Sequence, residues 1–282
     1  MKTYLDKNVY EAALERIAYC FQEFDNVLVA FSGGKDSGVL LNLCYNYADE
    51  HGLLDKLTMY HLDYEAQYQM TTEYVTRTFL EQFPGIRKMW YCVPIKAQSA
   101  CALGEPYWTP WDAAKKKLWV RAMPENPYVV HEGNLDVPFR HGMVDYEFQD
   151  KLSRHFAKKR GTTAVMVGLR ADESLNRYAA VARGKKRRSY EGRKWITQTS
   201  AVTANVYPLY DWRVSDIWTA TARFGFDYNR LYDLLYQAGL TAGQMRVASP
   251  FNDCAQESLK LYKVIDPSNW ARMIGRVNGV NF

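Results

Sequence analysis

The sequence is poor in cysteine, and none of its cysteines stands in a Cys-x-x-Cys pair. Its 282 residues include five, at positions 20, 44, 92, 101 and 254. An odd number without paired spacing argues against a disulfide framework and against a zinc knuckle. The cysteine pairs that would hold an iron–sulfur cluster are missing as well. We therefore expect a protein of the reducing cytoplasm that carries neither zinc nor an iron–sulfur cluster.

Long hydrophobic runs are missing too. No apolar run reaches the roughly 18 residues that a membrane helix requires, and the polar start MKTYLDKN predicts no signal peptide. We expect no membrane association. The net charge of +5 suits anionic ligands but does not by itself indicate nucleic-acid binding. These features leave the oligomeric state open.

The chain is organised around the stretch from Val27 to Tyr47, which reads as strand, glycine turn and helix. It opens with a short apolar run typical of a buried strand in a parallel sheet. The turn that follows consists of Ser32, Gly33, Gly34, Lys35, Asp36 and Ser37. The two glycines allow positive φ and close backbone approach, and apolar residues at helical spacing come next. Free N–H groups and the positive end of a helix dipole then meet Lys35, which predicts a phosphate site.

This turn is not a Walker A motif, which requires Ser or Thr directly after the lysine. Here Asp36 follows Lys35. Ser-Gly-Gly-Lys-Asp-Ser resembles the PP-loop of the ATP pyrophosphatase superfamily, which includes adenylating amidotransferases, tRNA-modifying thiolases and phosphoadenylylsulfate (PAPS) reductases. The resemblance implies that residues 32–37 bind the phosphates of ATP or PAPS, and that Lys35 and Asp36 take part in catalysis.

A second strand pattern, residues 57–62, ends at Asp63. A carboxylate at the carboxyl end of a parallel strand, beside a glycine loop, faces the ligand crevice. We expect Asp63 to contact ribose, the adenine amine or a metal ion, with Asp36 and Asp63 as candidate ligands of Mg²⁺. The alternative is a solvated acid in a turn.

A later apolar strand pattern, AVMVGL, runs into a second informative stretch, GLRADESLNR. Arg170 and Arg177 can each fork onto phosphate or sulfate oxygens, and Asp172 and Glu173 can bind a metal or orient the arginines. The stretch is similar to the Gly-x-Arg-x-x-Glu-Ser-x-x-Arg segment of PAPS reductases and the related ATP sulfurylase subunit. That resemblance implies catalytic roles for Arg170 and Glu173, and nucleotide contacts for Gly168, Arg170 and Arg177.

Two irregular segments interrupt the alternation of strands and helices. Residues 94–150 contain six prolines, with tryptophans among lysines, which favours a lid or a binding insertion. Such a segment can stack on and neutralise a nucleotide or single-stranded nucleic acid; the alternative is a small core of its own with a solvated lysine face.

Residues 183–195 are strongly basic and predict a flexible, anion-seeking loop, with nucleic acid as an open possibility. Arg246, in a further loop, is a candidate contact for a substrate anion.

The resemblance covers most of the chain. After a last strand pattern at residues 205–209, PLYDWRVSDIW is similar to the element that follows the last sheet strand in PAPS reductases. We therefore expect a Rossmann-like adenine nucleotide alpha hydrolase (HUP) fold, an α/β fold with a five-stranded, mostly parallel sheet flanked by helices. Residues 1–225 would form the PP-loop nucleotide-binding domain, including the insertion at about 94–150, and residues 226–282 a helical C-terminal extension.

One departure from the family pattern bears on the activity. PAPS reductases carry a nucleophilic cysteine near the C-terminus in a Glu-Cys-Gly-(Ile/Leu)-His setting, whereas Cys254 stands in Asn-Asp-Cys-Ala and no cysteine follows it. The chain looks more similar to the reductase-like proteins of phages and genomic islands, including the IbrA co-activator type, which are paired with a ParB-like partner.

Three functions therefore stay open. The first is an enzyme that uses Mg²⁺ and cleaves ATP between the α- and β-phosphates, forming an adenylate and pyrophosphate to activate an unidentified substrate. Such chemistry depends on positioning and on neutralising developing charge. The second is a nucleotide-binding regulator that acts with a ParB-like partner or DNA. The third is a PAPS reductase, which the missing cysteine motif disfavours.

Overall fold

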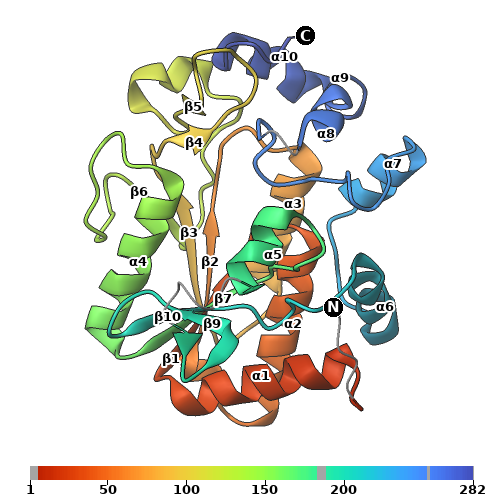
Figure 1. Ribbon diagram of the computed structural model, residues 1–282. Coiled ribbons are helices and arrows are strands. Elements are labelled where there is room, and N and C mark those ends of the chain that lie inside the picture. Colours follow the sequence, from red (N-terminus) through yellow and green to blue (C-terminus); the bar gives the residue numbers. More distant parts are fainter. Residues whose placement is uncertain (1–5, 183–188, 253–254, 282) are drawn as a thin grey trace.

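A single twisted sheet forms the centre of the molecule (Figure 1). The computed structural model describes residues 6–182, 189–252 and 255–281. The sheet has eight strands in the order β6-β3-β2-β1-β7-β10-β9-β8, and every pair from β6 to β10 is parallel, whereas β9 and β8 join antiparallel. The strands are β1 (Asn26–Ala30), β2 (Leu57–Leu62), β3 (Arg87–Cys92), β6 (Val129–His131), β7 (Thr163–Val167), β8 (Ser189–Tyr190), β9 (Arg193–Gln198) and β10 (Thr203–Val206).

The expected strands are all present, but the expected number of five is wrong because the sheet continues at both edges. Strand β6 adds to one edge and the β8–β9 hairpin to the other. These strands are short or contain charged residues, so no apolar run in the sequence predicts them. The loop expected at 183–195 is corrected in part: residues 183–188 lie outside the described residues, whereas residues 189–190 and 193–195 are strand.

Helices cover both faces of the sheet, as the alternating side chains of β1 require. Val27 and Val29 pack in one cluster with residues of α1, α2, α3 and α6, whereas Leu28 packs on the opposite face with Phe148 and Leu152 of α4. These helices are α1 (Val9–Glu23), α2 (Lys35–Glu50), α3 (Gln69–Glu81), α4 (Asp145–Arg160) and α6 (Val214–Phe224). In the described part of the chain, no helix is both long and apolar enough to cross a membrane.

The insertion and the C-terminal region pack together at the top of Figure 1. Trp108 meets Phe251 edge-on with ring centroids 5.0 Å apart, and Tyr68 stacks on Tyr262 at 3.4 Å. The two regions therefore share one hydrophobic cluster. Their elements are β4 (Ala97–Gln98), β5 (Tyr107–Trp108), the 3-10 helix η2 (Ala113–Leu118), α7 (Leu231–Gln237), α8 (Gln256–Lys260), α9 (Tyr262–Ile265) and α10 (Pro267–Arg276); η1 (Leu54–Lys56) precedes β2 and α5 (Leu175–Ala182) follows β7.

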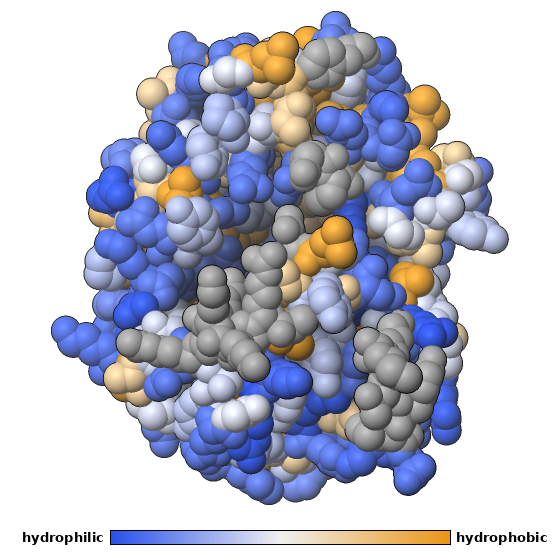
Figure 2. Space-filling view, viewed as in Figure 1, coloured by the Kyte–Doolittle hydropathy of each residue, from blue (hydrophilic) through white to orange (hydrophobic). Residues whose placement is uncertain are grey.

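The order of the strands reverses beside β1. From β1 the chain continues to β2 and β3 on one side, then returns to β7 and β10 on the other. In such sheets, ligands bind outside the carboxyl ends of the strands where the order reverses. The segments after β1 and β7 meet at that point. The surrounding face is largely hydrophilic, with hydrophobic residues in separate patches (Figure 2).

Candidate functional site

The glycine loop, residues 32–37, joins β1 to α2 in a tight turn. Gly33 has φ +79°, and a Cβ there would stand 2.9 Å from Cγ2 of Val75, so only glycine fits without strain. The Ser37 hydroxyl accepts a hydrogen bond from the Ser32 N–H at 3.1 Å and donates to the Gly34 carbonyl at 3.0 Å. The loop is therefore preformed by its own side chains, at the positive end of α2.

Gly168 brings the end of β7 against the first turn of α2. A Cβ at this position would lie 2.9 Å from both the carbonyl carbon of Asp36 and the nitrogen of Ser37. Backbone atoms cannot move aside as a flexible side chain can. Gly168 therefore sets the distance between the two segments that border the crevice.

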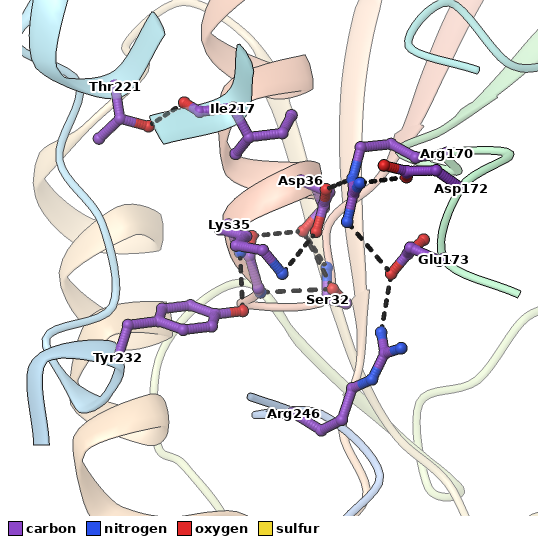
Figure 3. Close-up of polar contacts among 12 residues, drawn as sticks. Ser32, Lys35, Asp36, Arg170, Asp172, Glu173, Ile217, Thr221, Tyr232 and Arg246 are labelled. Atoms are coloured by element: carbon purple, nitrogen blue, oxygen red, sulfur yellow. Dashed lines mark hydrogen bonds and ion pairs between the residues drawn. The ribbon is translucent and has the colours of Figure 1, made fainter. Parts of the chain in front are cut away.

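Lys35, Asp36 and Arg170 form the centre of the site (Figure 3). Lys35 Nζ lies 3.1 Å from Asp36 Oδ2. Arg170 donates through Nε to Asp36 Oδ1 and through Nη1 to Asp172 Oδ1. Burial by itself would raise the pKa of the Asp36 carboxyl, but the charges of Lys35 and Arg170 outweigh it and hold that pKa below its ordinary value. Asp36 therefore stays ionised between two buried cations.

Glu173 gathers three arginines around one buried carboxylate. Arg246 Nη1 lies 2.7 Å from its Oε1 and Arg177 Nη1 lies 2.6 Å from its Oε2, while Arg170 Nη2 stands 3.8 Å away. The Glu173 side chain is only 4% exposed, whereas that of Arg177 is 41% exposed. We use the name loop array for this group together with the Lys35, Asp36 and Arg170 centre. It comprises the cations Lys35, Arg170, Arg177 and Arg246 and the acids Asp36, Asp172 and Glu173.

The loop array has a net charge of +1, from four cations and three acids. Ser32 is exposed beside it. An array of this kind holds its arginines in place through carboxylates while leaving a positive excess at the mouth of the crevice. Chemically, it suits a polyanion that can share or take over the guanidinium hydrogen bonds.

Two further residues, Tyr232 and Asn229, complete the site, and no short sequence motif predicts them. Tyr232 of α7 accepts the Lys35 N–H at 3.1 Å through its hydroxyl, and its ring lies 5.2 Å from Lys35 Nζ. Burial raises the pKa of the Tyr232 phenol, and the nearby Asp36 charge adds to this rise. Asn229 donates through Nδ2 to the Gly33 carbonyl at 3.3 Å and to the Thr71 hydroxyl at 2.8 Å. The C-terminal region therefore braces the glycine loop.

Asp63 does not have the surroundings expected from the sequence. Its side chain is fully buried, and Arg121 Nη2 donates to both of its oxygens at 2.6 Å. Trp90 Nε1 and the Glu65 N–H add bonds of 2.7 and 2.8 Å. Burial would raise the pKa of Asp63, but the Arg121 charge dominates and lowers it. Protein donors already satisfy this carboxylate, and the expected nucleotide or metal contact of Asp63 stays a prediction.

Comparisons with known proteins identify the family of the chain. Residues 26–238 match the phosphoadenosine phosphosulfate reductase domain, and residues 239–282 match a domain of unknown function (DUF3440). The chain is 36% identical over 279 residues to the uncharacterized protein YbdN of Escherichia coli strain K12, a match that covers 98% of this chain and 67% of that protein.

Two solved structures illustrate more distant similarity. A phosphoadenylyl-sulfate reductase from Candida auris, in a phosphate complex, has a TM-score of 0.45 and 12% identity, covering 88% of this chain and 97% of that one. An NH3-dependent NAD synthetase from Campylobacter jejuni has a TM-score of 0.39 and 11% identity, covering 96% of this chain and 93% of that one. Likenesses at this level are too distant to assign a function.

Proposed function

Because the chain belongs to the phosphoadenosine phosphosulfate reductase domain family, we propose that it binds ATP at the glycine loop and cleaves it between the α- and β-phosphates. The observation that carries this proposal is the meeting of the loop with Lys35 and Arg170 at the point where the strand order reverses. The acceptor is an oxygen nucleophile of a second, unidentified substrate.

The reaction would proceed by in-line displacement. The acceptor oxygen forms a bond to the α-phosphorus, the bond from that phosphorus to the bridging oxygen breaks, and pyrophosphate leaves with the bonding electrons. The first turn of α2 supplies N–H groups without intrahelical partners to the departing phosphates. Lys35 and Arg170 neutralise the charge that grows on the phosphate oxygens, which is the main contribution a protein makes to such a step.

Glu173 would act as a positioning residue. It holds Arg246 at 2.7 Å and Arg177 at 2.6 Å, so the arginines meet the nucleotide with little side-chain entropy left to lose. Asp36 plays the same part for Lys35 and Arg170.

The residues present fit Mg²⁺ in one way only. Among the described residues, no group of three or more His, Cys, Asp and Glu side chains stands together to enclose a metal ion. Mg²⁺ in nucleotide sites is held mainly by phosphate oxygens and water, with one or two carboxylates. Asp36 is the carboxylate that fits this role, whereas Asp63 is closed by Arg121. Bound with the nucleotide, Mg²⁺ would supply further neutralisation of the phosphate charge.

The test is to incubate the protein with ATP and Mg²⁺, with water as the acceptor in place of the second substrate, and to measure AMP and pyrophosphate. Wild-type protein should release both, and Lys35→Ala should abolish release and weaken ATP binding by at least about 10-fold, or 1.4 kcal/mol. Lys260→Ala, which removes an exposed lysine whose ion-pair partner is Glu257, is the matched control and should behave as wild type. Unchanged ATP affinity in Lys35→Ala would contradict the site.

A second candidate is a nucleotide-responsive regulator with little turnover, acting with a ParB-like partner or DNA. The observation that favours it is that Arg170 is already bonded to Asp36 and Asp172. In that case, ATP raises the melting temperature while neither AMP nor pyrophosphate appears, with or without an added partner. A third candidate, reduction of PAPS, would need Cys254, which lies outside the described residues; thioredoxin-dependent release of sulfite from PAPS that is lost in Cys254→Ser would establish that activity instead.

A further inference from the structure

A second hollow stands apart from the glycine loop. A cavity of about 1000 Å³ opens between the end of β3, the segment around η2, the β6 edge and Arg272 of α10. No residue of the glycine loop lines it. Its volume is at the upper end of the range for small-molecule sites, so it can hold a ligand of nucleotide size.

One wall of the cavity is aromatic. Trp111 and Trp119 stand almost perpendicular, with ring centroids 5.1 Å apart. Trp111 is buried beneath the guanidinium of Arg121, whereas Trp119 is only partly buried. The Trp119 indole N–H donates to the Asp112 carbonyl at 2.9 Å, which fixes the ring. Trp119 is thus a rigid, partly exposed surface on which a flat group can stack in place of the Lys116 ammonium, which lies 5.7 Å from its ring centroid.

The rim of the cavity is basic. Lys116, Lys117, Arg121 and Arg272 line it, against the acids Glu125 and Glu132. Glu132 is engaged by His141, whose Nε2 lies 2.6 Å away. Both lysines are exposed, and neither forms an ion pair with a described residue. Their charge is therefore available to an anion that enters.

Arg121 adds a further positive charge to the lining of the cavity. Its Nη2 is committed to Asp63, but its Nε is buried and has no hydrogen-bond partner among the described residues. Because this Nε is closed to solvent, an oxygen in the cavity does not reach it, and Arg121 contributes its positive charge to the lining.

We propose that this cavity is a second ligand site, which takes a nucleotide unit with its base against Trp119 and its phosphate between Lys116, Lys117 and Arg121. The unit comes either from a free nucleotide or from a single-stranded nucleic acid, since both present the same flat base and phosphate. The site does not depend on ATP cleavage at the glycine loop. It does stand at the same edge of the sheet, because Cys92 at the carboxyl end of β3 lines it.

The experiment is isothermal titration calorimetry on the full chain carrying Lys35→Ala, which weakens binding at the glycine loop, so that the cavity variants below decide where a probe binds. The probes are AMP and a single-stranded hexathymidylate. At least one of them should bind with a stoichiometry of one. Binding of AMP assigns the site to free nucleotides, and binding of the hexathymidylate with no binding of AMP assigns it to a strand.

Variants locate the binding in the cavity. Lys116→Ala with Lys117→Ala should weaken it at least 10-fold, and Trp119→Ala should do the same while Trp119→Phe retains most of the affinity. Lys115→Ala is the matched control, because Lys115 belongs to the same short helix and does not line the cavity. Circular dichroism confirms folding; if Trp119→Ala unfolds, the lysine pair decides.

Three outcomes overturn the proposal. The first is that neither probe binds to the Lys35→Ala protein. The second is that Lys115→Ala weakens binding as much as the lysine pair, which indicates diffuse charge attraction. The third is that Trp119→Ala leaves the affinity unchanged in a folded protein. If the site exists while wild-type protein fails to cleave ATP, only the glycine-loop function is lost.

Discussion

Two buried groups of acids and arginines stand at the same edge of the sheet, and they differ in how completely the protein satisfies them. In the first, which we call the closed array, Glu65 accepts four hydrogen bonds: two from Arg276 at 2.9 and 3.0 Å, one from the Trp111 N–H at 2.7 Å and one from the Val120 N–H at 3.0 Å. Together with Asp63 and Arg121, it comprises two acids and two arginines and has no net charge.

The loop array has a cation in excess, and its members reach the surface. Asp36 retains 14% side-chain exposure and Arg177 41%, whereas both acids of the closed array are at 0%. Its arginines bond to carboxylates that a polyanion can replace. The difference suggests a general criterion: a buried carboxylate that protein donors saturate holds segments of the chain together, whereas a group of ion pairs with excess charge and exposed members binds a ligand.

The largest expected effect concerns the closed array. Glu65→Ala leaves Arg276 as an uncompensated buried charge, which costs about 3–5 kcal/mol in the free energy of unfolding. Chemical denaturation measures this. Arg276→Ala should destabilise by a similar amount, because it leaves Glu65 unpaired in the same way.

The matched control is Glu257→Ala, which breaks an exposed pair with Lys260. Exposed pairs contribute about 0–1 kcal/mol, so this variant should unfold close to wild type. A loss below about 1 kcal/mol in Glu65→Ala would show that the two arrays are not different in kind.

The next effect falls on the loop array and on ligand handling. Arg170→Ala should lower the rate of ATP cleavage about 10²- to 10³-fold, the size seen when one preorganised donor to a transition state is lost. Arg170→Lys should recover only part of this, since lysine keeps the charge but not the fork. The rate of pyrophosphate release, corrected for folded protein, measures both variants. If Arg170→Ala instead unfolds as easily as Glu65→Ala yet retains ATP affinity, the loop array is structural.

The sequence predicted the residues of the loop array better than those of the closed array for a physical reason. Ser32 to Ser37 follow each other along the chain, and Arg170 follows directly on β7, so local pattern and strand order suffice to bring them together. Asp63 also follows a strand, but its partner Arg121 comes from the irregular insertion, 58 positions away. The position of Asp63 after a strand predicts that it lies at the carboxyl edge of the sheet, but it does not predict which residue it contacts there.

The same limit applies to the edges of the sheet and to the C-terminal region. Central strands such as β1 and β7 are buried on both faces and are readable as apolar runs. Strand β9, RKWITQ, which lies next to the edge strand β8, has four charged or polar residues out of six. Tyr232 reads as an ordinary helix residue, and its bond to the Lys35 N–H spans 197 positions. Contacts of this range depend on tertiary packing, which one sequence does not reveal.

A smaller effect concerns pH. The pKa values of Asp63 and Asp36 both lie below the ordinary value of 3.8. Burial would raise the pKa of each carboxyl. The charge of Arg121 outweighs burial at Asp63, and the charges of Lys35 and Arg170 outweigh it at Asp36. A depressed pKa contributes stability that is present above the unfolded value and is lost as pH falls through the folded value. The free energy of unfolding should therefore fall as pH drops below about 4, measured by denaturant titration at each pH.

Variants show how much each array contributes to this dependence of the free energy of unfolding on pH. Asp63→Asn should reduce the loss of unfolding free energy at acid pH more than Asp36→Asn does, because the Asp63 side chain has no exposure and that of Asp36 retains some. Equal slopes in wild type and Asp63→Asn would mean that Asp63 titrates normally, and the closed array would lose its distinguishing feature.

The smallest expected effect tests whether the loop array needs exact spacing. Gly168→Ala places a Cβ 2.9 Å from the α2 backbone, so β7 and the glycine loop must separate by a few tenths of an ångström. Overpacking of this kind costs about 1–3 kcal/mol in stability, and the displaced arginine should weaken ATP binding about 10-fold. Gly243→Ala is the matched control, because no atom lies within 4 Å of a Cβ there. Unchanged ATP affinity in Gly168→Ala would mean that the loop array adapts to its ligand instead of being preformed.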